Sequence, residues 1–204
     1  MTTGNRVPPP QLAVVQDFLN SRDHARGHDD FETTDQMRRW LVRHRLAAPQ
    51  TEFDDEDRHH LIEVRDALAT LVAANAGDGV PRRPVTILNE AARRVRLGVR
   101  LHPEDGYRLM AEGMGVDRPV GDLLVRVMGS MAAGSWSRLK VCANPACNRA
   151  FYDWSRNRSG RWCSMAVCGN RIKGRAYRRR RSGTAHDLQQ GGSVTHRAPV
   201  AAAS

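Results

Sequence analysis

Four cysteines are the residues whose type and spacing point most directly to chemistry. They are the only cysteines among the 204 residues: Cys142, Cys147, Cys163 and Cys168. The spacing C-x4-C-x15-C-x4-C is typical of a zinc site in which four thiolates surround one ion. Asn144-Pro145 lies inside the first pair and favours a tight turn. The sequence therefore predicts one structural Zn²⁺ per chain, with an iron–sulfur cluster or disulfides as the alternatives.

The positive charge of the chain is concentrated around these cysteines. The net charge is +10, yet residues 1–137 have a net charge of −2 and residues 182–204 are neutral. Residues 138–181 contain 13 Lys and Arg and a single acid, Asp153, which gives +12. A block of this kind attracts polyanions. Nucleic acid is therefore the expected partner, and a solvated basic segment without a partner is the alternative.

A short helix is predicted directly after the last cysteine, from Gly169 onward. Arg171, Arg175 and Arg178 fall at positions i, i+4 and i+7, so their guanidinium groups share one face. Phosphate contact is the expected role for most of the basic side chains here, and Arg171 could also read a base edge. The candidate nucleic-acid contacts are Arg156, Arg161, Arg171, Lys173, Arg175, Arg178 and Arg179.

The segments that precede the cysteines read as helical, with one β element. Apolar residues at helical spacing predict helices over 11–22, from Thr34-Asp35 through His44, from the acids at 54–57 to near Gly77, over 85–95, and from Pro119 towards Trp136. Thr34-Asp35 is the expected cap of the second helix, and four acids at 54–57 suit the first turn of the third. Alternation around Val99 and Leu109 predicts a small hairpin. The expected fold class is mainly α (α+β): a helical domain, then a small zinc finger with knuckles, short strands and a basic helix.

The composition favours a soluble, cytoplasmic protein that associates with the nucleoid. Mean hydropathy is −0.56, and no apolar run approaches the roughly 20 residues that cross a bilayer. No secretory signal is visible at the N-terminus. Thiols in that compartment stay reduced, which favours metal binding over disulfides.

Nothing in the sequence favours catalysis. Phosphate-loop, serine-hydrolase and H-E-x-x-H motifs are missing, and the eight histidines are scattered. Four thiolates also fill a zinc site completely, which leaves no open position for a substrate. The chain is therefore not expected to be an enzyme.

Two runs of residues carry a resemblance to known families. Phe151-x-Asp153-x-Ser155-Arg156 and the segment 161–173, with Cys168-Gly169-Asn170-Arg171 at its centre, resemble the CGNR zinc finger. The run 17–21 and shorter stretches near 40, 64–68 and 88 resemble the ABATE domain, whose members are described as stress-induced transcription regulators. Asn148 stands where the finger often has Gly, and Asn tolerates the left-handed backbone that such a turn needs.

The resemblance and the charge pattern together give a set of expectations. The domains would be a disordered segment 1–10, a helical ABATE-like domain 11–137, a CGNR zinc finger 138–181 and a disordered tail 182–204. The function would be that of a DNA-binding transcription regulator in a stress response, with an N-terminal domain that senses an effector or tethers the finger. RNA or ribosome binding through the same basic module, and a protein-interaction adaptor with a purely structural zinc, are the alternatives. The sequence does not define the effector or the oligomeric state.

Overall fold

The computed structural model describes residues 7–77, 79–104 and 106–179. The predicted disorder of residues 1–6 and 182–204 therefore lies outside the described residues, as do residues 180 and 181 of the finger. Residues 7–9 are irregular, and the first helix begins at Pro10. The chain divides into two compact units, one ending at Cys163 and one beginning at Ser164.

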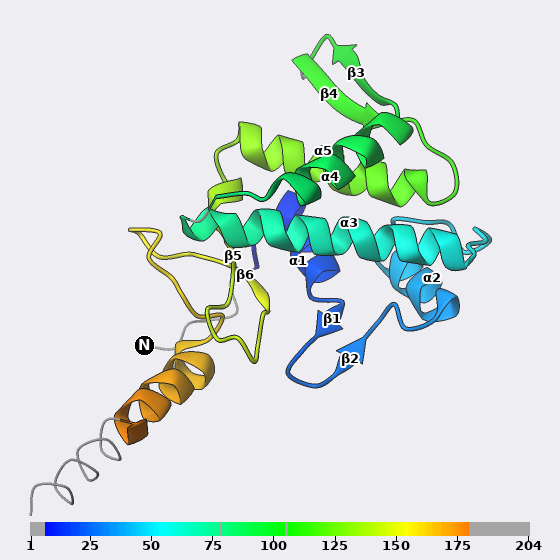
Figure 1. Cartoon of the computed structure of the whole chain (residues 1–204). Coiled ribbons are helices and arrows are strands. Elements are labelled where there is room, and N and C mark those ends of the chain that lie inside the picture. The colour runs from blue at the N-terminus through cyan, green and yellow to red at the C-terminus, as the bar shows by residue number, and fades with distance from the viewer. Residues whose placement is uncertain (1–6, 78, 105, 180–204) are drawn as a thin grey trace, which may run out of the picture. The chain divides into compact units, whose positions relative to one another are not determined.

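Five α-helices build the first unit (Figure 1). They are α1 (Pro10–Leu19), α2 (Thr34–Arg43), α3 (Asp55–Ala73), α4 (Arg82–Arg94) and α5 (Asp117–Ala132), with short 3₁₀ turns η1 (Ala74–Ala76) and η2 (Trp136–Arg138). Their starts follow local chemistry. The Asp54 carboxylate accepts a hydrogen bond from the Asp57 amide, and the Asp57 carboxylate accepts one from the Asp54 amide, which closes a capping box before α3. The cap of α2 is Thr33, paired with Gln36, and the predicted Thr34-Asp35 already lies inside the helix.

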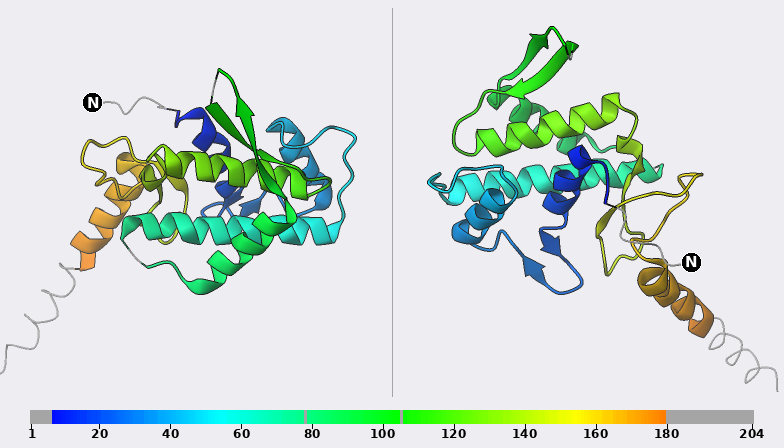
Figure 2. Two further views of the ribbon diagram at one scale, coloured as in Figure 1. Left: turned by 90° about the horizontal axis from the view of Figure 1, so that it is seen from above. Right: turned by 180° about the vertical axis from the view of Figure 1, so that it is seen from behind.

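The helices enclose one apolar core. Helix α3 runs the length of the unit, with α4 along one side of it, and α1 packs between α3 and α5 (Figures 1 and 2). Phe18, Phe31 and Trp40 form an aromatic cluster with ring centroids 5.5–5.8 Å apart. All three side chains are buried, so this cluster fixes α1 against α2.

A two-residue strand pair was not predicted, because strands this short have no readable alternation. The helix expected over 11–22 ends earlier, at Leu19, and the chain then forms strand β1 (Arg22–Asp23), which pairs with β2 (His28–Asp29). A buried arginine holds β2. The guanidinium of Arg65, on α3, donates to both carboxylate oxygens of Asp29 at 2.7 Å and to the hydroxyl of Ser21 at 2.8 Å. Bidentate pairing of this kind compensates for burying the Arg65 charge.

The predicted hairpin is confirmed and is longer than expected. Strands β3 (Leu97–His102) and β4 (Gly106–Ala111) pair antiparallel, with Val99 opposite Leu109 and Leu101 opposite Tyr107. Its base rests on α5 at a glycine. A Cβ at Gly121 would lie 2.3 Å from the Cβ of Ala111, so only glycine permits this close approach. The outer part of the hairpin projects beyond the helices (Figure 1).

A second unpredicted feature is the way the first finger strands join the helical core. Strands β5 (Leu139–Val141) and β6 (Ala150–Tyr152) pair antiparallel. Leu139 and Ala150 are buried in the same cluster as the residues of α1, α3 and α5. The amide of Asn75 donates to the carbonyls of Trp136 and Leu139 at 3.0 and 2.9 Å, which ties η1 to the start of β5. The expected boundary at 137/138 therefore runs through a continuous core. In the described ranges, no helix has the length and apolar character needed to traverse a lipid bilayer.

Candidate metal centre

The four predicted cysteines meet at one point. Their sulfur atoms all lie within 4.8 Å of one another, and the Sγ atoms of Cys147 and Cys163 are 3.6 Å apart. Four thiolates at Zn–S distances of about 2.3 Å lie roughly 3.8 Å apart at the corners of a tetrahedron. The spacing thus fits a single ion, and the donor set is that of a structural zinc. No disulfide links these cysteines.

The electrostatics of the cluster also call for a cation. Burial raises the pKa of the Cys163 thiol, and the neighbouring Cys147 and Cys142 thiols raise it further. Thiolates that are crowded into a desolvated space repel one another, which raises the free energy of the deprotonated cluster. A divalent cation at their centre offsets this repulsion. Zinc at Cys142, Cys147, Cys163 and Cys168 would thus stabilise the fold around it, since metal binding and folding are coupled in such modules.

The first cysteine pair is positioned by a turn that its own sequence specifies. The carbonyl of Asn144 accepts from the amide of Cys147 at 2.8 Å, and the amide of Cys142 donates to the carbonyl of Arg149 at 2.9 Å. Asn148 has a φ of 50°, which confirms the left-handed conformation expected at that position. The amide of Ala143 donates to the Arg161 carbonyl at 2.9 Å, so the turn is joined to the segment that enters Cys163.

A buried ion pair shapes the loop between the two cysteine pairs. Lys140 donates to the carboxylate of Asp153 at 2.8 Å and also to the carbonyl of Arg158. The same carboxylate accepts from the amides of Ser155 and Gly160 at 2.9 and 2.8 Å. Burial acts to raise the pKa of Asp153, but these hydrogen bonds outweigh burial and lower it to about 2. Sequence reasoning noted Asp153 without finding its partner, because Lys140 lies 13 residues away on β5.

This loop carries predicted contact residues to the surface. Arg156 and Arg161 are exposed, and Arg161 lies over the ring of Trp162 at 5.4 Å. One exposed aromatic side chain was not predicted as part of the site. Trp154 is 44% exposed and packs against Tyr152 with ring centroids 4.7 Å apart. The exposed aromatic beside arginines was the signal that could have identified it.

The second unit contains the remaining predicted contacts. The hydroxyl of Ser164 accepts from the amide of Val167 and starts a wide helical turn, η3 (Met165–Gly169), which holds Cys168. An α-helix follows over 170–179, as predicted. The five basic side chains predicted here all lie exposed on it: Arg171, Lys173, Arg175, Arg178 and Arg179.

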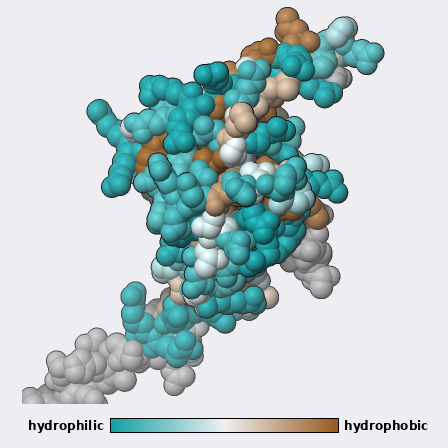
Figure 3. All heavy atoms as spheres, turned by 90° about the vertical axis from the view of Figure 1, so that its right-hand side faces the viewer, coloured by the Kyte–Doolittle hydropathy of each residue, from teal (hydrophilic) through white to brown (hydrophobic). Residues whose placement is uncertain are grey.

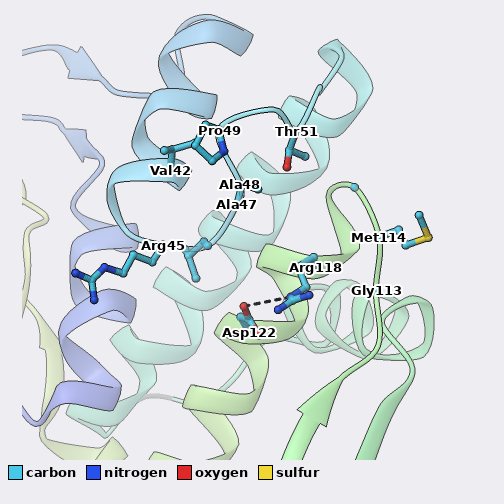
Figure 4. A pocket seen from close by; sticks show the side chains of 12 residues that line it. Val42, Arg45, Ala47, Ala48, Pro49, Thr51, Gly113, Met114, Arg118 and Asp122 are labelled. Atoms are coloured by element: carbon cyan, nitrogen blue, oxygen red, sulfur yellow. Dashed lines mark ion pairs between the residues drawn. The ribbon is translucent and has the colours of Figure 1, made fainter.

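A pocket lies in the helical domain, away from the cysteines in sequence. It has a volume of about 720 Å³ and lies between the segment after α2 and the loop that leads into α5 (Figure 4). Much of the lining is apolar, including Val42, Leu46 and Ala47. On the α5 side, Nε of Arg118 lies 3.8 Å from a carboxylate oxygen of Asp122. Burial raises the pKa of Asp122, against the opposing effect of Arg118 and Arg126.

The rim of this pocket includes a residue in an unfavourable backbone conformation. Arg45 has a φ of 58°, and the amides of Arg45 and Leu46 donate back to the carbonyls of Val42 and Leu41. This pattern ends α2 in a Schellman motif, at the position where glycine is usual. An arginine costs about 1 kcal/mol more than glycine in that conformation. Strain of this kind often accompanies functional sites.

Comparison with known proteins agrees with both halves of this arrangement. The model of the ABATE family, described as "Putative stress-induced transcription regulator", matches residues 12–133. The model of the CGNR zinc finger matches residues 138–181, which include all four cysteines. A search of curated proteins found no match. The ABATE match covers more than half of the chain, so the chain belongs to the ABATE family and carries a CGNR zinc finger at its C-terminal side.

Proposed function

We propose that this protein is a transcription regulator that binds double-stranded DNA through its zinc finger. The observation that carries the proposal is the charge of the finger surface. Asp153 is the only acid among residues 138–181, and it is 3% exposed and paired with Lys140. The basic side chains exposed in the described part of the finger, among them Arg156, Arg161, Arg171, Lys173 and Arg175, therefore have no competing carboxylate from the same segment, which favours binding of a polyanion.

Two elements of the finger would contact DNA. The helix over 170–179 offers Arg171, Arg175 and Arg178 at spacings that suit successive phosphates. The loop after β6 offers Arg156 and Arg161, and the Lys140–Asp153 pair holds its backbone. Zinc has a structural role: it fixes the cysteine turns from which both elements start.

Salt dependence of binding is the test. If about six phosphates are contacted, the slope of log affinity against log salt should be near −5. Arg175→Ala should reduce the magnitude of that slope by about one and weaken binding to all sequences alike. Arg171→Ala should also relax sequence preference if Arg171 reads a base edge. Arg83→Ala, an exposed arginine on α4, is the matched control and should bind as wild type does. A flat salt response would leave the adaptor function standing instead.

RNA binding is the second candidate, and one observation favours it. Trp154 is exposed beside Tyr152, and single-stranded bases stack on aromatic surfaces of this kind. Competition between duplex DNA and single-stranded RNA at fixed salt separates the two. If wild type and Trp154→Ala both bind duplex DNA more tightly than single-stranded RNA, the result supports the DNA regulator. Preference for single strands that Trp154→Ala abolishes supports RNA binding.

The pocket in the helical domain is proposed as the effector site of the regulator. Its size suits a small molecule, and its apolar walls with one ion pair suit a largely apolar ligand with one polar group. The dye 1-anilinonaphthalene-8-sulfonate has this chemistry and serves as a probe. It should bind one site per chain with enhanced fluorescence, and Ala47→Phe, which fills the pocket, should remove that site. Equal fluorescence from wild type and Ala47→Phe would exclude this pocket.

A further inference from the structure

The hairpin β3–β4 has one apolar face whose outer half is not covered by any described residue. Strand register places the side chains of alternate residues together on this face: Leu97, Val99, Leu101, Tyr107, Leu109 and Ala111. The opposite face carries Arg100 opposite Arg108 and His102 opposite Gly106. One face of the hairpin is therefore apolar and the other polar. This pattern is typical of a strand pair that packs on a core, although the hairpin projects from the domain.

Only the base of the apolar face is packed. Leu97 packs against the core, and Ala111 touches α5 at Gly121. Farther out, Val99, Leu101 and Tyr107 are 64%, 79% and 60% exposed. Figure 3 shows apolar surface gathered at the projecting end of the molecule, at the top of the view. The apolar stripe thus continues from the core into solvent, where two strands alone have little stability.

We propose that this face is a contact between two copies of the chain, packed around a two-fold axis. The face is apolar along its whole length, so it complements a second identical face, as a symmetric dimer requires. Neighbouring copies would cover Val99, Leu101 and Tyr107 of each other and give each hairpin the second layer that it lacks.

Charge along the hairpin favours an antiparallel arrangement of the two copies. Glu104 and Asp105 lie between the two strands in the sequence, while Arg93 and Arg96 precede the first strand and Glu112 follows the second. Arg94 is already paired with Asp117. The turn is thus net negative and the base net positive. Two-fold packing of antiparallel hairpins brings the turn of one copy toward the base of the other, which pairs opposite charges at both ends.

The same charges argue against DNA as the occupant. Residues 96–112 contain three arginines and three acids, and two of the acids lie between the strands in the sequence, where a groove-binding hairpin would need positive charge. The C-terminal tail is also a poor complement. Residues 182–204 have only three aliphatic residues larger than alanine, Leu188, Val194 and Val200, spaced six apart and without strand alternation.

The dimensions of the hairpin set the strength of the contact. Six-residue strands about 20 Å long and a pair about 10 Å wide give a face of roughly 200 Å² per copy. Stable complexes bury about 800 Å² per partner. The dimer is therefore expected to dissociate in the micromolar range, and simultaneous binding of two fingers to one DNA would strengthen it.

Sedimentation of the zinc-loaded full chain over a range of micromolar concentrations tests the proposal. Wild type should convert from monomer to dimer. Leu101→Gln should raise the dissociation constant roughly tenfold to a hundredfold, because each dimer loses two buried leucines. Arg100→Gln, the adjacent position on the opposite face, is the matched control and should change it less than twofold. Both variants should keep the thermal unfolding of the monomer, since neither side chain is buried there.

Four outcomes would overturn the proposal. Wild type could stay monomeric throughout, the dimer could survive Leu101→Gln unchanged, or both variants could weaken it equally. The fourth outcome concerns the tail: if deleting residues 182–204 converts a monomer into a dimer, the tail covers this face in the native chain.

Discussion

Asn20 and Ala150 are joined by two hydrogen bonds across 130 residues of sequence. The side-chain amide of Asn20 donates to the Ala150 carbonyl at 2.9 Å, and the Ala150 amide donates to the Asn20 side-chain oxygen at 2.8 Å. One side chain therefore satisfies both backbone groups of a residue on β6, as a neighbouring strand would. Because Ala150 lies between the cysteine pairs, this contact fastens the finger strands to the end of α1.

Removing one half of this contact should weaken the whole first unit. Asn20→Asp keeps the shape of the side chain but replaces its donor with a charged acceptor that faces the Ala150 carbonyl. We expect a loss of about 2 kcal/mol in the free energy of unfolding, because a partly buried carbonyl loses its donor. Denaturant unfolding of zinc-loaded protein measures this. Asn89→Asp, an exposed position on α4, should cost little. Equal costs for the two variants would contradict the role of Asn20.

Loss of the metal should affect the finger before the helices. Purified protein should contain one zinc per chain, and Cys163→Ser should lose it. We expect proteolytic cleavage to appear within residues 142–178, while far-ultraviolet circular dichroism retains the signal of α1–α5. Elemental analysis checks the first result and mass spectrometry of the fragments checks the second. Iron with visible absorbance in the purified protein would contradict the zinc assignment.

Truncation tests whether the domain boundary at 137/138 is a folding boundary. That boundary predicts that residues 11–137 fold on their own. The buried positions of Leu139 and Ala150 now favour the opposite result, because a chain that ends at 137 leaves part of its core open. A fragment that ends at residue 163 should be the more stable of the two. Thermal unfolding of the two fragments compares their stabilities. Equal stability would support a folding boundary at 137/138.

The buried ion pair in the finger predicts a defined pH dependence. Lys140→Met leaves the Asp153 carboxylate buried without its cation and should cost about 3 kcal/mol at neutral pH. The folded-state pKa of Asp153 is about 2, below its ordinary value of 3.8, so the contribution of the carboxylate is complete above about pH 4. It is lost as the pH falls toward 2.

Without Lys140, burial is no longer outweighed to the same extent, so the pKa of Asp153 is higher in Lys140→Met than in wild type. The stability difference between the two proteins should therefore narrow as the pH falls through the pKa of Asp153 in the variant, while wild type keeps the full contribution of the carboxylate down to about pH 4. Protonation of the zinc thiolates acts on both proteins, so the difference reports on the pair. Lys173 is the only other lysine of the chain and its side chain is exposed, so Lys173→Met serves as the control. A difference that stays unchanged from pH 7 down to about pH 3 would contradict the assignment to Asp153.

Local chemistry explains which features the sequence predicted well. The cysteine spacing identified the metal ligands, the acids at 54–57 located the start of α3, and alternation located the hairpin, since each signal lies within a few residues of the feature it specifies. The left-handed turn at Asn148 was predictable for the same reason.

Long-range pairing explains the rest. The bonds of Arg65 to Asp29, of Lys140 to Asp153 and of Asn20 to Ala150 join segments between 13 and 130 residues apart, and no periodicity encodes them. The exposed face of the hairpin was also missed. Alternation showed that one face is apolar, but only the packed structure shows where α5 stops covering it.

The shared core also sets an order on synthesis. Helix α1 leaves the ribosome early, but its partner strand β6 follows only after some 130 further residues. At translation rates of roughly 5–20 residues per second, that interval is on the order of ten seconds. During this time the apolar side of α1 has no completed core to enter. The core that α1 enters therefore lacks Leu139 and Ala150 until the first cysteine pair has nearly been made, so completion of the core and assembly of the first metal ligands fall close together in synthesis.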